Sequence, residues 1–78
     1  MRELIEFLAK SLVDNPDDVK TRTYERGGDH GTVIELEVAP DDLGKVIGRQ
    51  GRTARAIRIL LSAAGQKSRR RYSLDIVD

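Results

Sequence analysis

The chain has 78 residues and a net charge of +1 at pH 7, which predicts one small domain spanning residues 1–78. It has no cysteine and a single histidine, so we exclude a disulfide framework, a thiolate nucleophile and a typical metal site, and we expect no cofactor. The absence of cysteine favours the reducing cytoplasm as the compartment. No segment approaches the roughly 18 consecutive apolar residues of a membrane span, so we expect no signal peptide and no membrane anchor.

The first half of the chain predicts a helix followed by a β-hairpin. Residues 2–13 carry apolar residues at spacings of three and four, which is typical of an amphipathic helix, and Asn15-Pro16 ends it. The expected buried residues of this helix are Leu4, Ile5, Phe7, Leu8 and Leu12. Alternating residues predict strands over residues 19–25 and 32–39, and the glycine-rich turn over residues 27–31 predicts that they pair antiparallel.

The second half predicts two helices and a final strand. Pro40-Asp41-Asp42 is expected to start a short helix, with an Asp side chain capping its first amides, and Gly48 is expected to end it. After Gly51 a longer helix is expected to run to about Ala64 and to end at Gly65 in a left-handed C-cap. The residues predicted to face inward from this helix are Ala54, Ile57, Leu60, Leu61 and Ala64. After a basic connection, the final strand is expected to turn three residues to the core: Tyr72, Leu74 and Ile76.

The predicted order is therefore helix, strand, strand, helix, helix, strand. Strands that alternate apolar and polar residues form a sheet with one buried face and one solvated face. We predict an α+β fold in which helices pack on one face of a three-stranded sheet.

The charges are distributed unevenly along the chain. Residues 1–42 contain 11 acids and five bases, whereas residues 43–74 contain nine bases and no acid. Charge runs often serve only to keep a small domain soluble. The complete absence of acids over this span nevertheless favours a polyanionic partner that approaches from one side.

The segment Gly48-Arg49-Gln50-Gly51, which we call the glycine loop, is the most informative part of the sequence. Glycines at a corner between two helices let a ligand backbone approach closely and permit unusual backbone angles. The amides at the start of the second helix carry positive partial charge, which suits a phosphate oxygen. Arg49 and Gln50 are expected to contact a sugar-phosphate backbone, with unstacked bases in an apolar groove formed by Val46, Ile47 and the adjacent strand.

A GxxG pattern alone is frequent, but here it follows Val46-Ile47 and precedes a basic amphipathic helix, in the element order given above. The segment over residues 44–58, GKVIGRQGRTARAIR, resembles the signature of the KH domain. The whole chain is similar to the KhpA family of small bacterial proteins with a single KH domain. Its helix-first order resembles the type II KH topology.

This resemblance implies binding of single-stranded RNA with broad specificity, and a role as an RNA chaperone or post-transcriptional regulator. It also implies a homodimer, or a heterodimer with a larger Jag-type KH protein, KhpB, in a process linked to cell shape, division and the cell wall. Carried onto this sequence, it places the clamp on the glycine loop, with Val46 and Ile47 against the bases. The cations expected on the same surface are Lys45, Arg49, Arg52 and Arg55.

The run over residues 67–71 is more basic than the family pattern requires. It would either enlarge the RNA footprint or solvate an edge strand, where charges discourage aggregation, and both readings stay open.

A second surface is predicted on the long helix. Ala56, Ile59 and Ala63 share a flank of this helix, away from its inward residues. Singly exposed apolar residues are common. A chain this small gains stability by association, however, and the family resemblance points the same way, so we expect a dimer contact on this flank.

An enzymatic function is not expected, because its parts are missing. Asp41 and Asp42 are adjacent, the Ser and Thr residues have no nearby His, and neither loop glycine is followed by the Lys-Ser or Lys-Thr of a Walker sequence. His30 is expected to be a solvated turn residue, and no small-molecule substrate is expected. Two rivals stay open: a protein-protein adaptor, and a binder of single-stranded DNA.

Overall fold

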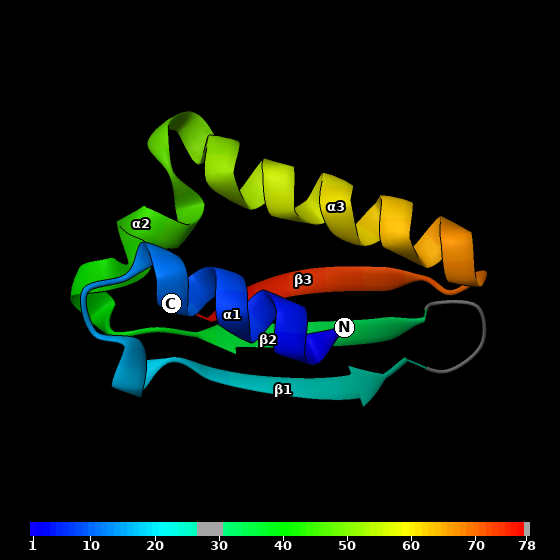
Figure 1. Ribbon diagram of the computed structural model, residues 1–78, viewed down its shortest axis with the longest axis horizontal. Coiled ribbons are helices and arrows are strands. Elements are labelled where there is room, and N and C mark those ends of the chain that lie inside the picture. Colours follow the sequence, from blue (N-terminus) through cyan, green and yellow to red (C-terminus); the bar gives the residue numbers. More distant parts are fainter. Residues whose placement is uncertain (27–30, 78) are drawn as a thin grey trace.

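The computed structural model describes residues 1–26 and 31–77 (Figure 1). Its helices and strands are α1 Arg2–Leu12, β1 Lys20–Glu25, β2 Thr32–Glu37, α2 Leu43–Ile47, α3 Arg52–Ser68 and β3 Tyr72–Val77. Short 3₁₀ turns lie at Pro16–Asp18, Pro40–Asp42 and Arg49–Gly51. The predicted order of helices and strands is confirmed, while His30 and most of the predicted hairpin turn lie outside the described residues.

The three strands form one mixed sheet in the order β1-β2-β3. β1 and β2 are antiparallel, with Thr23 opposite Ile34, and β2 and β3 are parallel, with Ile34 opposite Leu74. A parallel pair needs a long crossover connection, which α2 and α3 supply here. The two helices that flank the glycine loop therefore lie within the connection between β2 and the edge strand β3.

The core lies between the helices and one face of the sheet. It joins Ile5 of α1, Val46 of α2 and Ile57 of α3 to Ile34 and Leu74 of the strands. The opposite face carries alternating charged residues, among them Arg22, whose guanidinium pairs with Glu35 at 3.0 Å. The prediction of an α+β sandwich with helices on one face of the sheet is confirmed (Figure 1).

α1 buries a narrower stripe than its apolar residues predict. Ile5 and Ala9 are buried, but Leu4 and Leu12 are exposed, and Phe7 is 66% exposed. Phe7 lies two residues after Ile5, which is about 200° around a helix, so it points away from the sheet when Ile5 points towards it. The expectation that Phe7, Leu4 and Leu12 belong to the core was wrong, because Phe7 and Leu4 lie off the buried stripe and Leu12 is the last residue of the helix.

α3 differs from its prediction in its face and in its end. Leu60 is 49% exposed, because Ile57 and Leu61 take the buried side of the helix. The helix also continues past Gly65 to Ser68, and Arg69 is the residue that adopts the left-handed conformation after it, with φ of 57°. Gly65 instead lets the returning chain pass close by, since its carbonyl accepts a hydrogen bond from the Arg70 amide at 2.7 Å.

No helix in the described part of the chain is both long enough and apolar enough to cross a membrane.

Candidate nucleic-acid interface

The glycine loop forms a tight corner between α2 and α3. Gly48 ends α2 with φ of 79° and ψ of 171°, and its amide donates to the Gly44 carbonyl at 2.8 Å. A Cβ added at Gly48 would lie 2.7 Å from the Cβ of Thr53 and 2.8 Å from its backbone nitrogen. A side chain at position 48 therefore collides with the first turn of α3, and only glycine fits.

The tip of the loop has an unusual backbone. Gln50 has φ of 56° and Gly51 has φ of 74°, so two successive residues are left-handed. Such a conformation costs a residue with a side chain roughly 1–2 kcal/mol, and the surrounding structure must hold it in place. The Gly51 amide donates to the Gly48 carbonyl at 3.1 Å, and the Arg52 amide donates to the Arg49 carbonyl. These bonds fix the loop, while the side chains of Arg49 and Gln50 remain exposed.

The start of α3 adds positive potential beside the loop. Its N-cap residue is Gly51, its first turn contains no acid, and Arg52 and Arg55 are exposed on its first two turns. The positive end of a helix dipole favours an anion at this place. Cations and helix end together make the corner suited to a phosphate group.

A groove lies next to the corner, between α2, α3 and the edge strand β3. It is lined by Leu43, Ile47, Gly51, Ala54, Arg58 and Ile76, of which only Arg58 has a polar side chain. A groove that combines aliphatic side chains with one guanidinium is chemically suited to an unstacked base held beside its phosphate.

Ile47 lies in this groove, but Val46 does not. The side chain of Val46 is 0% exposed and belongs to the core. Because α2 turns by about 100° per residue, Val46 points to the sheet when Ile47 and Leu43 point to the groove. The expectation that Val46 lies against the bases was therefore wrong.

Four groove residues were not named from the sequence: Leu43, Ala54, Arg58 and Ile76. Helical spacing could have indicated two of them, because residues four apart lie on the same side of a helix. Leu43 lies four residues before Ile47, and Arg58 lies four residues after Ala54. Ile76 was assigned to the core, where it packs in part, and only the parallel pairing of β3 places it at the groove.

The expected helix cap by an Asp is also absent. Asp42 makes no side-chain bond to the amides of its own helix, and its carboxylate is buried. It accepts hydrogen bonds from the Asn15 amide at 3.0 Å, the Asn15 Nδ2 at 3.0 Å and the Asp14 amide at 3.3 Å. It also accepts one from the Lys45 ammonium at 3.2 Å. Burial opposes its ionisation, but the hydrogen bonds from Asn15, Asp14 and Lys45 outweigh that effect and lower the pKa of Asp42.

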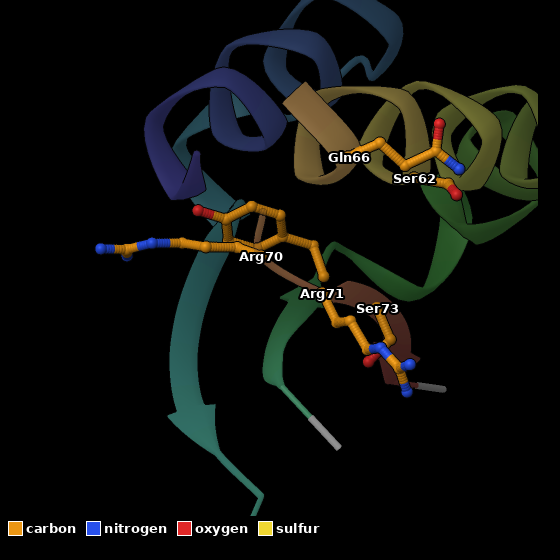
Figure 2. A pocket seen from close by; sticks show the side chains of 6 residues that line it. Ser62, Gln66, Arg70, Arg71 and Ser73 are labelled. Carbon is orange, nitrogen blue, oxygen red and sulfur yellow. The ribbon is translucent and has the colours of Figure 1, made fainter. Parts of the chain in front are cut away.

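A second hollow lies at the far end of α3, where the helix turns back into β3 (Figure 2). It is lined by Ser62, Gln66, Arg70, Arg71, Tyr72 and Ser73. Figure 2 shows Ser62 and Gln66 next to each other on α3, with Arg71 and Ser73 below them and Arg70 directed away. Ser62 and Gln66 follow Arg58 at spacings of four, so the same side of α3 borders both hollows.

The expected dimer flank is accessible in the single chain. Ile59 is 64% exposed, and Ala56 and Ala63 are exposed on either side of it. These three residues form a small apolar strip on the solvent side of α3.

Comparison with known proteins identifies the family. The family described as KhpA/KhpB, KH domain matches residues 2–76. The chain is 53% identical over 78 residues to RNA-binding protein KhpA of Halalkalibacterium halodurans, covering 100% of both chains. It is 54% identical over 76 residues to RNA-binding protein KhpA of Borreliella burgdorferi, covering 97% of this chain and 90% of the relative. It is also 50% identical over 78 residues to RNA-binding protein KhpA of Streptomyces coelicolor, covering 100% of this chain and 92% of the relative.

No solved structure matches the chain. The relatives are named as RNA-binding proteins, and the family is not one of enzymes, which agrees with the prediction from the sequence. A family match over nearly the whole chain, together with full-length relatives at about half identity, leaves one assignment: this chain belongs to the KhpA/KhpB family of KH-domain proteins.

Proposed function

We propose that this protein binds single-stranded RNA at the glycine loop and the adjoining groove. The observation that carries the proposal is the enclosed position of Gly48, where an added Cβ would overlap Thr53, so that this corner between α2 and α3 has no room for a side chain. Membership of the family, and relatives named as RNA-binding proteins, support the choice of RNA as the ligand.

In the proposed complex, one phosphate lies against the corner. The start of α3 and the side chains of Arg49, Arg52 and Arg55 supply the positive charge, and Gln50 supplies a hydrogen bond. Because these contacts are to the backbone, they fix the strand without reading its sequence. Broad specificity follows, and a single domain of this type holds about four nucleotides.

The neighbouring bases occupy the groove. Ile47, Leu43 and Ile76 form its apolar surface, and the guanidinium of Arg58 stacks on a base or meets the next phosphate. A site of this size gives weak binding, so usable affinity requires a second domain held nearby. We place the contact to that second domain on Ala56, Ile59 and Ala63, in a homodimer or a heterodimer with a Jag-type KhpB protein.

A cytoplasmic RNA chaperone or post-transcriptional regulator is the role that fits such a module. Contacts to the backbone hold many RNAs, and weak single-site binding releases them again. Because the chain belongs to this family, we further propose that its role is linked to cell shape, division and cell-wall homeostasis.

The test is a titration of labelled single-stranded RNA followed by fluorescence anisotropy. Wild type is compared with Arg49→Asp, Gln50→Asp at two salt concentrations, with DNA of the same sequence as a further ligand. Asp tolerates the left-handed conformation at position 50, so the variant is expected to fold. The matched control, Arg2→Asp, Ser11→Asp, changes the net charge equally on exposed positions of α1.

We expect RNA binding that weakens with salt, collapses in the loop variant and persists in the control. Equal binding by wild type and loop variant, or none by either, would move the function to a protein-protein adaptor acting through the exposed Ile59. Equal binding of the two nucleic acids would extend the ligand to single-stranded DNA.

A further inference from the structure

Lys45, inside the glycine-rich motif, points away from the groove. Leu43 and Ile47 line the groove from α2, and Lys45 lies two residues from each of them. Two residues correspond to about 200° around a helix, so the side chain of Lys45 leaves the opposite side of α2. A strand in the groove is therefore on the far side of the helix from this ammonium.

The ammonium of Lys45 is held by two carboxylates. It donates to Asp14 Oδ2 and, at 3.2 Å, to Asp42 Oδ1. These hydrogen bonds, first to Asp14 and then to Asp42, raise the pKa of Lys45, so the side chain is charged throughout the physiological range. Lys45 is thus engaged within the protein.

The same carboxylate of Asp42 holds the chain that follows α1. It accepts the backbone amides of Asp14 and Asn15 and the side-chain amide of Asn15. One cluster of hydrogen bonds, which we call the latch, therefore joins three parts: the end of α1, the residue before α2 and the middle of α2. Its members are Asp14, Asn15, Asp42 and Lys45.

α2 depends on such outside support. A helix of five residues is far too short to be stable by itself, so its position is set by what it packs against. Val46 anchors it to the core on one side, and Gly44 contributes no side chain. On the side of α2 opposite the groove, the latch is what holds the helix in its orientation.

We propose that Lys45 is a positioning residue, which fastens α2 through Asp14 and Asp42 and so sets the place of Ile47 and the glycine loop, without touching RNA. This inference rests on the proposed function for its consequence, since the loop so positioned is the RNA clamp. It replaces the expectation that Lys45 is one of the RNA-binding cations.

The two roles of Lys45 differ in a measurable way. A lysine that pairs with a phosphate releases a counterion, so its removal lowers the slope of log Kd against log salt by about 0.7 for a single strand. A lysine that only positions the loop changes the affinity and leaves that slope unchanged. Local hydrogen exchange reports the positioning role independently of RNA.

The experiment compares Lys45→Met, which keeps the stem and removes the charge, with Lys45→Arg, which keeps a donor for both carboxylates. Arg55→Met serves as a phosphate-contact reference, and Lys20→Met, on the open face of the sheet, serves as the control. RNA affinity is measured over a range of salt, and amide exchange is measured at Gly48 and Gly51 of the loop and at Ile34 and Leu36 of β2.

For Lys45→Met we expect RNA affinity about five-fold weaker at an unchanged salt slope, and faster exchange at the loop amides with little change in β2. Lys45→Arg should restore both. A salt slope that falls as it does in Arg55→Met, or unchanged affinity and exchange, would overturn the proposal.

Two further outcomes are decided by the same data. If Lys45→Met does not fold, Asp14→Asn replaces it, because this exposed position supplies one of the two carboxylates that hold Lys45. Asp14→Asn should accelerate amide exchange at the glycine loop and not in β2. Unchanged exchange would contradict the latch. If the wild-type protein binds no RNA, the proposed function fails, while loop exchange still confirms or refutes the latch.

Discussion

Gly48 and Gly51 both have positive φ, but only Gly48 is enclosed by neighbouring atoms. Among the described residues, nothing lies within 4 Å of a Cβ added at Gly51, whereas one added at Gly48 meets the backbone nitrogen of Thr53 at 2.8 Å. Rotation of the Thr53 side chain cannot relieve an overlap with backbone. The two glycines of the loop are therefore required for different reasons.

Alanine at the two positions should separate these reasons. We expect Gly51→Ala to lower the free energy of unfolding by about 1–2 kcal/mol, the cost of the left-handed backbone alone. Gly48→Ala should lower it by about 1–3 kcal/mol more, because α2 and α3 must move apart. Chemical denaturation of both variants measures the difference, and equal stability of the two would show that the Thr53 contact does not constrain the loop.

Asp42 predicts a pH dependence of stability. Its pKa in the folded protein is lowered from the ordinary 3.8, by hydrogen bonds from Asn15, Asp14 and Lys45 that outweigh burial. A lowered pKa in the folded protein means that the unfolded chain binds the proton more tightly. The contribution of ionised Asp42 to the free energy of unfolding is therefore present above about pH 3.8 and is lost as pH falls through the folded pKa. Acid should therefore weaken the latch.

The measurement is the free energy of unfolding of wild type and Asp42→Asn between pH 7 and pH 3. We expect the variant to be less stable at pH 7. The difference in the free energy of unfolding should shrink below about pH 3.8, where the unfolded wild-type chain takes up the proton more readily than the folded protein does. Asp41→Asn, which removes the exposed neighbouring carboxyl outside the latch, is the matched control. If the difference in the free energy of unfolding between wild type and Asp42→Asn stays constant with pH, the ionised carboxylate of Asp42 is not the source of the stabilisation.

At the scale of the elements, local pattern predicted what each segment is, and tertiary contacts decided where it ends and which face it buries. The order of the helices and strands and the alternation of β2 followed from apolar spacing. Phe7 and Leu60 were misplaced because α1 and α3 carry apolar residues over a wider arc than the sheet covers. Asp42 was misassigned because its partners lie 27 and 28 residues away in sequence.

The end of α3 illustrates the same limit. A glycine after an apolar stripe is typical of a helix C-cap, yet Gly65 is helical and buried. A Cβ there would meet the Arg70 carbonyl oxygen and lie 3.3 Å from Cδ2 of Tyr72. The close approach of the returning chain, which no local pattern reports, explains this glycine.

Gly65→Ala sets helix propensity against packing. Alanine favours a helix over glycine by about 1 kcal/mol, whereas overlap with a backbone carbonyl typically costs about 1–3 kcal/mol. Because the carbonyl belongs to the main chain, we expect packing to win and the variant to be less stable in denaturant. Gln66→Gly, at the exposed neighbouring position on α3 and outside the dimer strip, should lose roughly 0.5 kcal/mol through propensity alone. A stabilised Gly65→Ala would show that the chain after α3 yields easily.

At the scale of the whole molecule, the exposed strip on α3 predicts self-association. Ile59 is 64% exposed and lies between two exposed alanines on α3. Phe7 on α1 is 66% exposed and lies outside this strip. We expect Ile59→Lys to reduce the mass in sedimentation equilibrium to that of the monomer, because a buried lysine charge is costly at an apolar contact. Phe7→Lys is the matched control and should leave the mass unchanged. An unchanged mass in Ile59→Lys would place any dimer contact elsewhere.

The length of α3 bears on the open question of the basic run over residues 67–71. The glycine loop and this run lie at opposite ends of α3, a helix of 17 residues or about 25 Å (Figure 1). The side of α3 that carries Arg58, Ser62 and Gln66 borders a hollow at each end. A strand held at the loop that follows this side would reach the second group of cations only if it is longer than about four nucleotides.

Oligonucleotide length therefore separates the two readings of the basic run. An eight-nucleotide RNA offers several positions to a four-nucleotide site, which by itself raises the apparent affinity. If the basic run extends the footprint, the eight-nucleotide RNA should bind more tightly than this effect explains, and with a steeper dependence of log Kd on log salt. Lys67→Gln, Arg70→Gln should cancel that gain and leave the four-nucleotide affinity unchanged, because neither residue lies near the loop. If the run only solvates the edge strand, the variant should bind both RNAs as wild type does and aggregate more readily. We expect the first result, since the eight bases from Arg49 to Arg71 have no acid among them, and the polar residues Ser62 and Gln66 connect the two groups of cations along one side of α3.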